Sequence, residues 1–128
     1  MSHYPVYDRA IERTMYDPSK IEQLRELMND DQAEMLSLVE EYEGNSTSLI
    51  QQMLDATARR SALELTRAAH TLKSSSALMG ASGLARLCEE LETLSHQGKI
   101  PPDVEERIRQ ITTEFAEASR WLRAQICG

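Results

Sequence analysis

The chain has 128 residues, a formal net charge of −7 and 41% hydrophobic residues, a balance typical of a folded globular protein. A nucleic-acid-binding surface is not expected, because such surfaces need clustered basic residues. No apolar run approaches the roughly 18–20 residues of a membrane span, so we expect a soluble, cytoplasmic protein with no membrane contact. The chain has only 5 Gly and 4 Pro, which are too few for the turns between many short strands, and good helix formers dominate. The sequence therefore predicts an all-α protein.

The first elements are a partly helical N-terminal segment, residues 1–16, and the start of a single domain that fills residues 17–128. A short helix is expected over about residues 8–15 of the segment. Asp17 and Pro18 supply an N-cap and a first-turn proline for the helix that opens the domain. Asn29 and Asp30 end that helix.

A long helix is predicted from residue 31 to about residue 58. Its apolar positions alternate spacings of four and three: Met35, Val39, Tyr42, Ser46, Leu49, Met53 and Ala56. The register continues through Gly44, although glycine inside a helix costs about 1 kcal/mol relative to alanine. One long helix is therefore favoured over two short ones.

Three more helices complete the chain. Ser61 and Glu64 form a capping-box pattern that opens a helix over about residues 62–79, which Gly80 ends. Ser82 is expected to cap the next helix, and a final helix follows Pro101. Their apolar positions are Leu84, Leu87, Cys88, Leu91 and Leu94, then Val104, Ile108, Ile111, Phe115, Ala118 and Leu122. The pattern predicts an antiparallel up-down four-helix bundle, with one or two short N-terminal helices capping it.

The helix over residues 62–79 places a histidine on its outer face. A helical wheel puts Leu65, Ala69, Leu72, Ser76 and Met79 on the core side. His70 points about 140° away from Leu65, toward solvent. Its neighbours on the surface are Thr66, Arg67, Lys73 and Ser74, with Ala77 two turns on. These side chains are mostly short, and two are cations, which suits the approach of another protein that carries a dianionic group.

The chemistry follows from the imidazole, which is substantially neutral at pH 7 and offers a lone pair that can attack phosphorus. No Gly-rich loop for nucleotide phosphates and no carboxylate cluster for Mg²⁺ accompany His70, and the two cysteines lack metal-ligand spacing. We therefore expect a phosphotransfer protein that is not an enzyme, has no ATP-binding or kinase motif, and binds no metal or cofactor itself.

The residues around His70 resemble the histidine-containing phosphotransfer domains of multistep phosphorelays. The matching stretches are Ala69-His70-Thr71-Leu72-Lys73, Ser75-Ser76 and Gly80-Ala81, followed by Leu84, Cys88, Glu89 and Leu91-Glu92. The resemblance implies that His70 accepts a phosphoryl group from a receiver-domain aspartyl phosphate and passes it reversibly to another receiver. The implied partners are the receiver domains of a hybrid sensor kinase and a response regulator. Mg²⁺ would come from the receiver, and Lys73 would support the phosphoryl group electrostatically.

This sequence departs from the family pattern at Ser74, where glycine usually follows the lysine. The Ser74 hydroxyl is expected to bond back to the His70 carbonyl or to a phosphoryl oxygen. Some relatives carry an amide on the adjoining helix that touches the histidine, where this chain has Glu92. The sequence leaves open whether Glu92 orients the imidazole or is a solvated charge. We group Thr66, Arg67, Ser74, Ala77 and Glu92 as expected partner-docking residues.

Two other functions stay open from the sequence. One is the dimerisation and phosphoacceptor fragment of a histidine kinase, although such fragments present His-Glu where this chain has His70-Thr71. The other is a non-catalytic helical adaptor in which His70 is incidental. A monomer is expected for the phosphorelay intermediate, and the sequence does not distinguish a free protein from a domain of a larger kinase.

Overall fold

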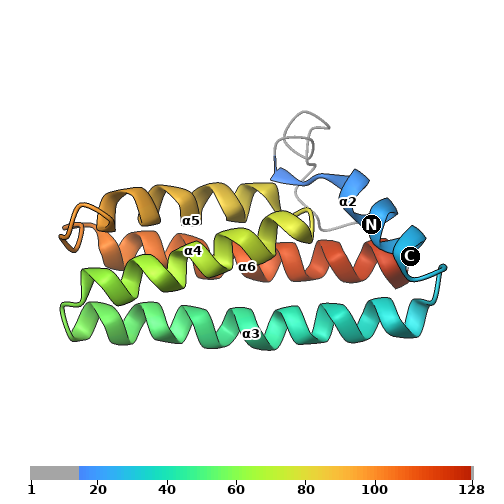
Figure 1. The fold of residues 1–128 in the computed structure, drawn as a ribbon, viewed down its shortest axis with the longest axis horizontal. Helices are drawn as coiled ribbons and strands as arrows, with labels where there is room; N and C mark the ends of the chain where they lie inside the picture. Colours follow the sequence, from blue (N-terminus) through green and yellow to red (C-terminus); the bar gives the residue numbers. More distant parts are fainter. Residues whose placement is uncertain (1–14, 128) are drawn as a thin grey trace, which may run out of the picture.

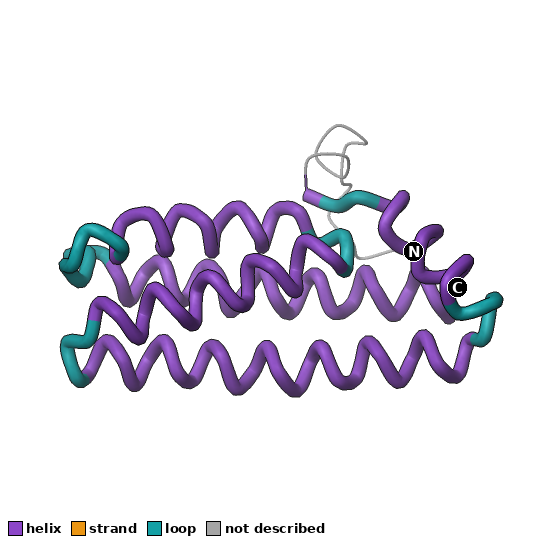
Figure 2. Tube along the Cα trace, in the orientation of Figure 1, coloured by secondary structure: helices purple, strands orange, loops and turns teal. Residues whose placement is uncertain are grey.

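The computed structural model describes residues 15–127, and in that range the chain consists of helices and connecting loops without a strand (Figure 2). The helices are α2 (Pro18–Leu27), α3 (Gln32–Ala58), α4 (Ala62–Leu78), α5 (Ser82–Ser95) and α6 (Val104–Cys127). Helices α3 to α6 form an antiparallel bundle, and α2 lies across one end of it beside the C-terminal end of α6 (Figure 1). The predicted all-α bundle with a short capping helix is confirmed.

The predicted helix over about residues 8–15 lies, apart from Met15, outside the described residues. The division of the chain at residues 16 and 17 stays a prediction. In the part of the chain that the structure describes, every helix is too short or too polar to span a membrane.

The helices begin where the sequence places their caps, with one exception. The side chain of Asp17 accepts a hydrogen bond from the Ser19 amide, and that of Ser61 accepts one from the Glu64 amide. The predicted Ser82 cap is wrong: Ala81 is the N-cap of α5, and its side chain makes no capping bond. Ser82 is already inside the helix because Gly80, with φ of 81°, turns the chain one residue earlier than a Ser82 cap would need.

The core lies where the bundle helices meet, with α3 and α5 each packed against both α4 and α6. Most predicted core positions are buried, including the full predicted stripe of α4. Ile50 is buried where the sequence predicted Leu49, which is only half-buried, because successive side chains of a helix point about 100° apart and that of Ile50 lies nearer the centre of the buried face. Leu87, Leu94 and Phe115 are also half-buried, at the edges of the interface rather than its centre.

The capping helix α2 is held by contacts that the sequence pattern did not predict. The ring of Tyr16 stacks on Trp121 of α6 with centroids 4.5 Å apart. The Asp17 amide donates a 2.8 Å hydrogen bond to the Gly80 carbonyl, which joins the start of α2 to the end of α4. A Cβ atom at Gly80 would lie 2.6 Å from the Asp17 carbonyl oxygen, so glycine allows both the left-handed turn and this close approach.

Candidate functional site

His70 lies at the middle of α4 with its side chain 58% exposed. Ala69 and Leu72, which lie close to His70 in the sequence but on the core side of α4, are fully buried. The orientation follows from helical periodicity, since α4 has a single apolar stripe and His70 falls outside it. The predicted projection of the imidazole into solvent is confirmed.

Glu92 of α5 reaches across to this imidazole. Its Oε2 atom lies 2.7 Å from Nδ1 of His70, and its side chain is 21% exposed. A carboxylate can only accept a hydrogen bond, so Nδ1 carries the ring hydrogen in neutral His70. The lone pair is then on Nε2, which is the nitrogen available for attack on an incoming group.

The second oxygen of Glu92 pairs with Lys73, whose Nζ lies 2.6 Å from Oε1. Burial works to raise the pKa of Glu92, but the hydrogen bonds from Lys73 and then His70 outweigh it and lower that pKa. The same contact raises the pKa of Lys73. Lys73 is therefore charged and paired with Glu92, a contact that the sequence did not predict.

The remaining predicted docking residues surround His70 to different extents. Arg67, Ser74 and Ala77 are exposed on the same face of α4. The Ser74 hydroxyl donates a 3.1 Å hydrogen bond to the His70 carbonyl, as predicted, and so leaves little bulk on the surface. Thr66 is half-buried, with its hydroxyl 2.8 Å from that of Ser95 on α5, so it lies between the helices rather than on the exposed ridge.

A shallow depression adjoins His70 between the C-terminal half of α4 and the start of α5. It has a volume of about 490 Å³, and Lys73, Ser74 and Ala77 form the side nearest His70. Lys20 and Arg86 line it further on. Asp17 and Glu89 also line it, so its charged lining is mixed.

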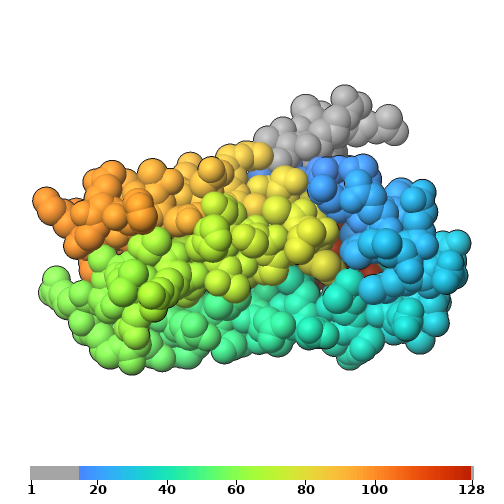
Figure 3. All heavy atoms as spheres, in the orientation of Figure 1, coloured from blue at the N-terminus to red at the C-terminus, as the bar shows by residue number. Residues whose placement is uncertain are grey.

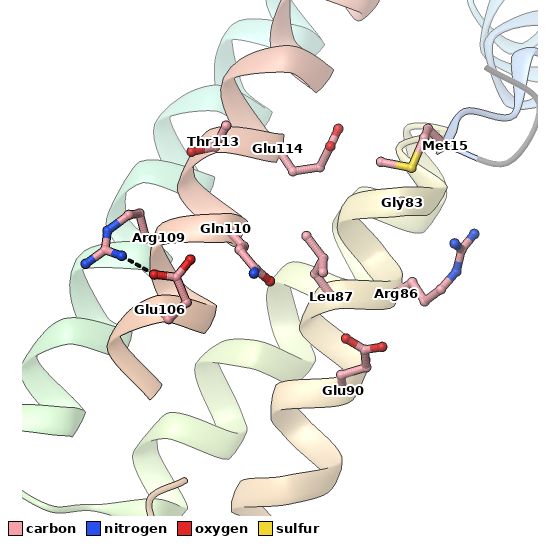
Figure 4. A pocket seen from close by; sticks show the side chains of 10 residues that line it. All are labelled: Met15, Gly83, Arg86, Leu87, Glu90, Glu106, Arg109, Gln110, Thr113 and Glu114. Atoms are coloured by element: carbon pink, nitrogen blue, oxygen red, sulfur yellow. Dashed lines mark hydrogen bonds and ion pairs between the residues drawn. The ribbon is translucent and has the colours of Figure 1, made fainter. Parts of the chain in front are cut away.

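A second depression, of about 530 Å³, lies between α5 and α6 (Figure 4). Charged side chains on its rim include Glu106 and Arg109, which pair with each other along α6. The residues that line this depression include neither a histidine nor a cysteine, so His70 is not among them. The α4 face around His70, and not this depression, is therefore the candidate site.

The sequence left the role of Glu92 open, although a signal for its contact with α4 was present. Cys88, Glu92 and Ser95 follow one another at spacings of four and three on α5. Cys88 and Ser95 are buried, so the stripe faces the bundle and Glu92 must lie at its margin, toward α4. Among residues 15–127, no group of three or more His, Cys, Asp or Glu side chains could hold a metal ion.

Comparison with known proteins agrees with this geometry. The sequence model of the Hpt domain matches residues 37–121, more than half of the chain. The chain therefore belongs to the Hpt domain family, and it is a histidine phosphotransfer intermediate of phosphorelays rather than a kinase. Its structure is similar to that of histidine-containing phosphotransfer protein B (HptB) from Pseudomonas aeruginosa PAO1, with a TM-score of 0.76 and 26% sequence identity over 87% of this chain and 93% of the other. No curated protein matches the chain.

Proposed function

We propose that His70 is the phosphoacceptor, and that it takes a phosphoryl group from the aspartyl phosphate of one receiver domain and passes it to another. The observation that supports this most directly is the exposed imidazole whose Nδ1 is held by Glu92 at 2.7 Å. Nε2 attacks phosphorus, the N–P bond forms, and the bond between phosphorus and the aspartyl oxygen breaks. The aspartate leaves as a carboxylate with the electron pair, and the reverse transfer follows the same path.

Glu92 acts as a positioning residue in this proposal. As Nε2 bonds to phosphorus, the imidazole gains positive charge, which the adjacent carboxylate stabilises. The carboxylate also fixes the tautomer, so no proton has to leave Nε2 before attack. Lys73, 2.6 Å from the same carboxylate, is close enough to the imidazole to shift toward a phosphoryl oxygen. Phosphoryl transfer depends mostly on such charge neutralisation and positioning.

The receiver supplies the rest of the active site. We assign Mg²⁺ to the receiver, because the described residues of this chain offer no metal-ligand group near His70. A monomeric carrier in the cytoplasm is part of the proposal. The kinase-dimerisation alternative is disfavoured because α3 to α6 close a four-helix bundle within one chain.

The test is transfer of labelled phosphate from a phosphorylated receiver to the purified chain. Wild type should gain an acid-labile, base-stable label, and His70→Gln should gain none. His96→Gln changes an exposed histidine at the C-cap of α5 and should label as wild type does. Equal labelling of His70→Gln and wild type would refute the assignment.

A further inference from the structure

We infer that a hydrogen bond between Thr66 of α4 and Ser95 of α5 fixes the axial position of these two helices, so that Glu92 lies opposite His70. The inference rests on the proposed transfer at His70. Thr66 and Ser95 are then positioning residues, which act through Glu92 rather than on the phosphoryl group. Figure 3 shows the face on which α4, in green to yellow, lies beside α5, in yellow to orange.

Ser95 is a polar residue at a position where α5 otherwise buries apolar side chains. The same buried stripe carries Leu84, Cys88 and Leu91. Ser95 itself is only 1% exposed, and a buried hydroxyl lowers stability unless it is hydrogen-bonded. Its Oγ atom lies 2.8 Å from Oγ1 of Thr66. A hydrogen bond is directional, unlike the contacts of aliphatic core residues, so it is the kind of interaction that specifies how two helices align.

Both hydroxyls of this pair are also tied to the backbone of their own helix. The Ser95 hydroxyl lies 2.8 Å from the Leu91 carbonyl and 3.3 Å from the Glu92 carbonyl. The Thr66 hydroxyl lies 2.7 Å from the Ala62 carbonyl. Whichever hydroxyl donates across the interface, the other therefore has a carbonyl acceptor for its own hydrogen. The pair thus joins the backbone of α4 to the turn of α5 that carries Glu92.

The pair lies closer to His70 than the turn that connects the two helices. Thr66 precedes His70 by one helical turn, about 6 Å along the axis, whereas Gly80 follows it by about 15 Å. Ser95 follows Glu92 by about one turn, so the two contacts between α4 and α5 lie on adjacent turns. An axial shift by one residue, about 1.5 Å, would lengthen and misalign the 2.7 Å contact between Glu92 and Nδ1. The hydroxyl pair opposes such a shift at the turn next to the imidazole.

The experiment removes one hydroxyl at a time. Thr66→Val keeps the branched shape and Ser95→Ala keeps a small side chain, and in each variant the remaining hydroxyl still has a carbonyl of its own helix, so both should fold. Thr66→Ser restores the hydroxyl without the methyl group. Thr57→Val is the matched control, because Thr57 is also half-buried but its hydroxyl donates to the Met53 carbonyl of its own helix, α3.

Two measurements report on His70 itself. ¹⁵N NMR of the imidazole gives the fraction of rings that carry hydrogen on Nδ1, and labelling by phosphoramidate gives the reactivity of the ring without a receiver. Thr66→Val and Ser95→Ala should lower the Nδ1–H fraction and slow labelling about fivefold, the effect of one weakened hydrogen bond. Thr66→Ser and Thr57→Val should behave as wild type. A purely structural role of the pair would leave both measurements unchanged in the folded protein.

A double-mutant cycle shows whether the pair acts through Glu92. Thr66→Val should slow labelling in the wild-type background but hardly at all beside Glu92→Ala, since no carboxylate is then left to position. The inference is overturned if Thr66→Val and Ser95→Ala keep the wild-type tautomer and rate, if Thr57→Val loses as much, or if Thr66→Val has the same effect in both backgrounds. Absence of phosphoramidate label on His70 of wild type would instead refute the proposed phosphoacceptor, and the tautomer measurement would still test the pair.

Discussion

Glu92 on α5 holds Nδ1 of His70 on α4 at 2.7 Å, so the proposed phosphoacceptor and the group that orients it come from different helices. The same carboxylate pairs with Lys73 through its other oxygen. One side chain thus links the imidazole to the cation expected to assist transfer. The link depends on a negative charge, because both neighbours are hydrogen-bond donors toward it.

Replacing Glu92 should slow transfer without unfolding the protein. Glu92→Gln keeps an acceptor for Nδ1 but loses the charge that stabilises the developing imidazolium, so we expect a rate lower by about tenfold. Glu92→Ala should be slower still, since the ring is no longer oriented. Single-turnover transfer gives the rates, and ¹⁵N NMR of the imidazole reports the tautomer. A wild-type rate and tautomer ratio in both variants would show that Glu92 is only a solvated charge.

A bulky side chain at Ser74 should block the receiver. Ser74 is exposed and follows His70 by one turn, so Ser74→Trp places a large ring over the approach to Nε2. Transfer should fall by about 100-fold or more, as expected when near-attack geometry is prevented. Thermal unfolding should change little because the site is on the surface. Normal transfer by a folded Ser74→Trp protein would mean that receivers dock elsewhere.

Two glycines with positive φ should differ in their tolerance of alanine. Gly98 has φ of 88° and nothing within 4 Å of an added Cβ, so Gly98→Ala should cost only about 1 kcal/mol of unfolding free energy. Gly80 has the same backbone strain, and its Cβ would also lie 2.6 Å from the Asp17 carbonyl oxygen. Gly80→Ala should therefore cost about 2 kcal/mol more. Urea denaturation of the two variants gives the comparison. Equal losses of unfolding free energy would show that α2 can move away from Gly80 at no cost.

The unfolding free energy should fall as the pH is lowered, because carboxylates that form ion pairs in the bundle become protonated. The hydrogen bond from Arg123 outweighs burial and holds the pKa of Glu43 below its ordinary 4.5, and Glu92 behaves in the same way through Lys73 and His70. A depressed folded-state pKa gives stability that is present above the ordinary value and is lost as pH falls through the folded value. Urea denaturation between about pH 7 and pH 3 should show this loss. Glu43→Gln should flatten the decline, and an unchanged slope would contradict the role of the Glu43–Arg123 pair.

Most of the helices, and the face that each one buries, could be predicted from the sequence alone. Caps such as Ser61 and the four-three spacing of apolar residues act within one helix, so local chemistry is enough to place them. For the same reason, the exposure of His70 and the hydrogen bond from Ser74 to its carbonyl could be predicted from α4 alone.

The contacts between different helices could not be predicted in this way, because they depend on how the helices pack. The bridge from Glu92 to His70, the stacking of Tyr16 on Trp121 and the hydrogen bond from the Asp17 amide to the Gly80 carbonyl all join separate elements. Their formation depends on the axial shift and crossing angle of neighbouring helices, which ridge-into-groove packing sets and periodicity along one helix does not encode. His70 and Glu92 are 22 residues apart in the sequence but 2.7 Å apart in the folded bundle. Their pairing therefore depends on how α4 and α5 pack against each other.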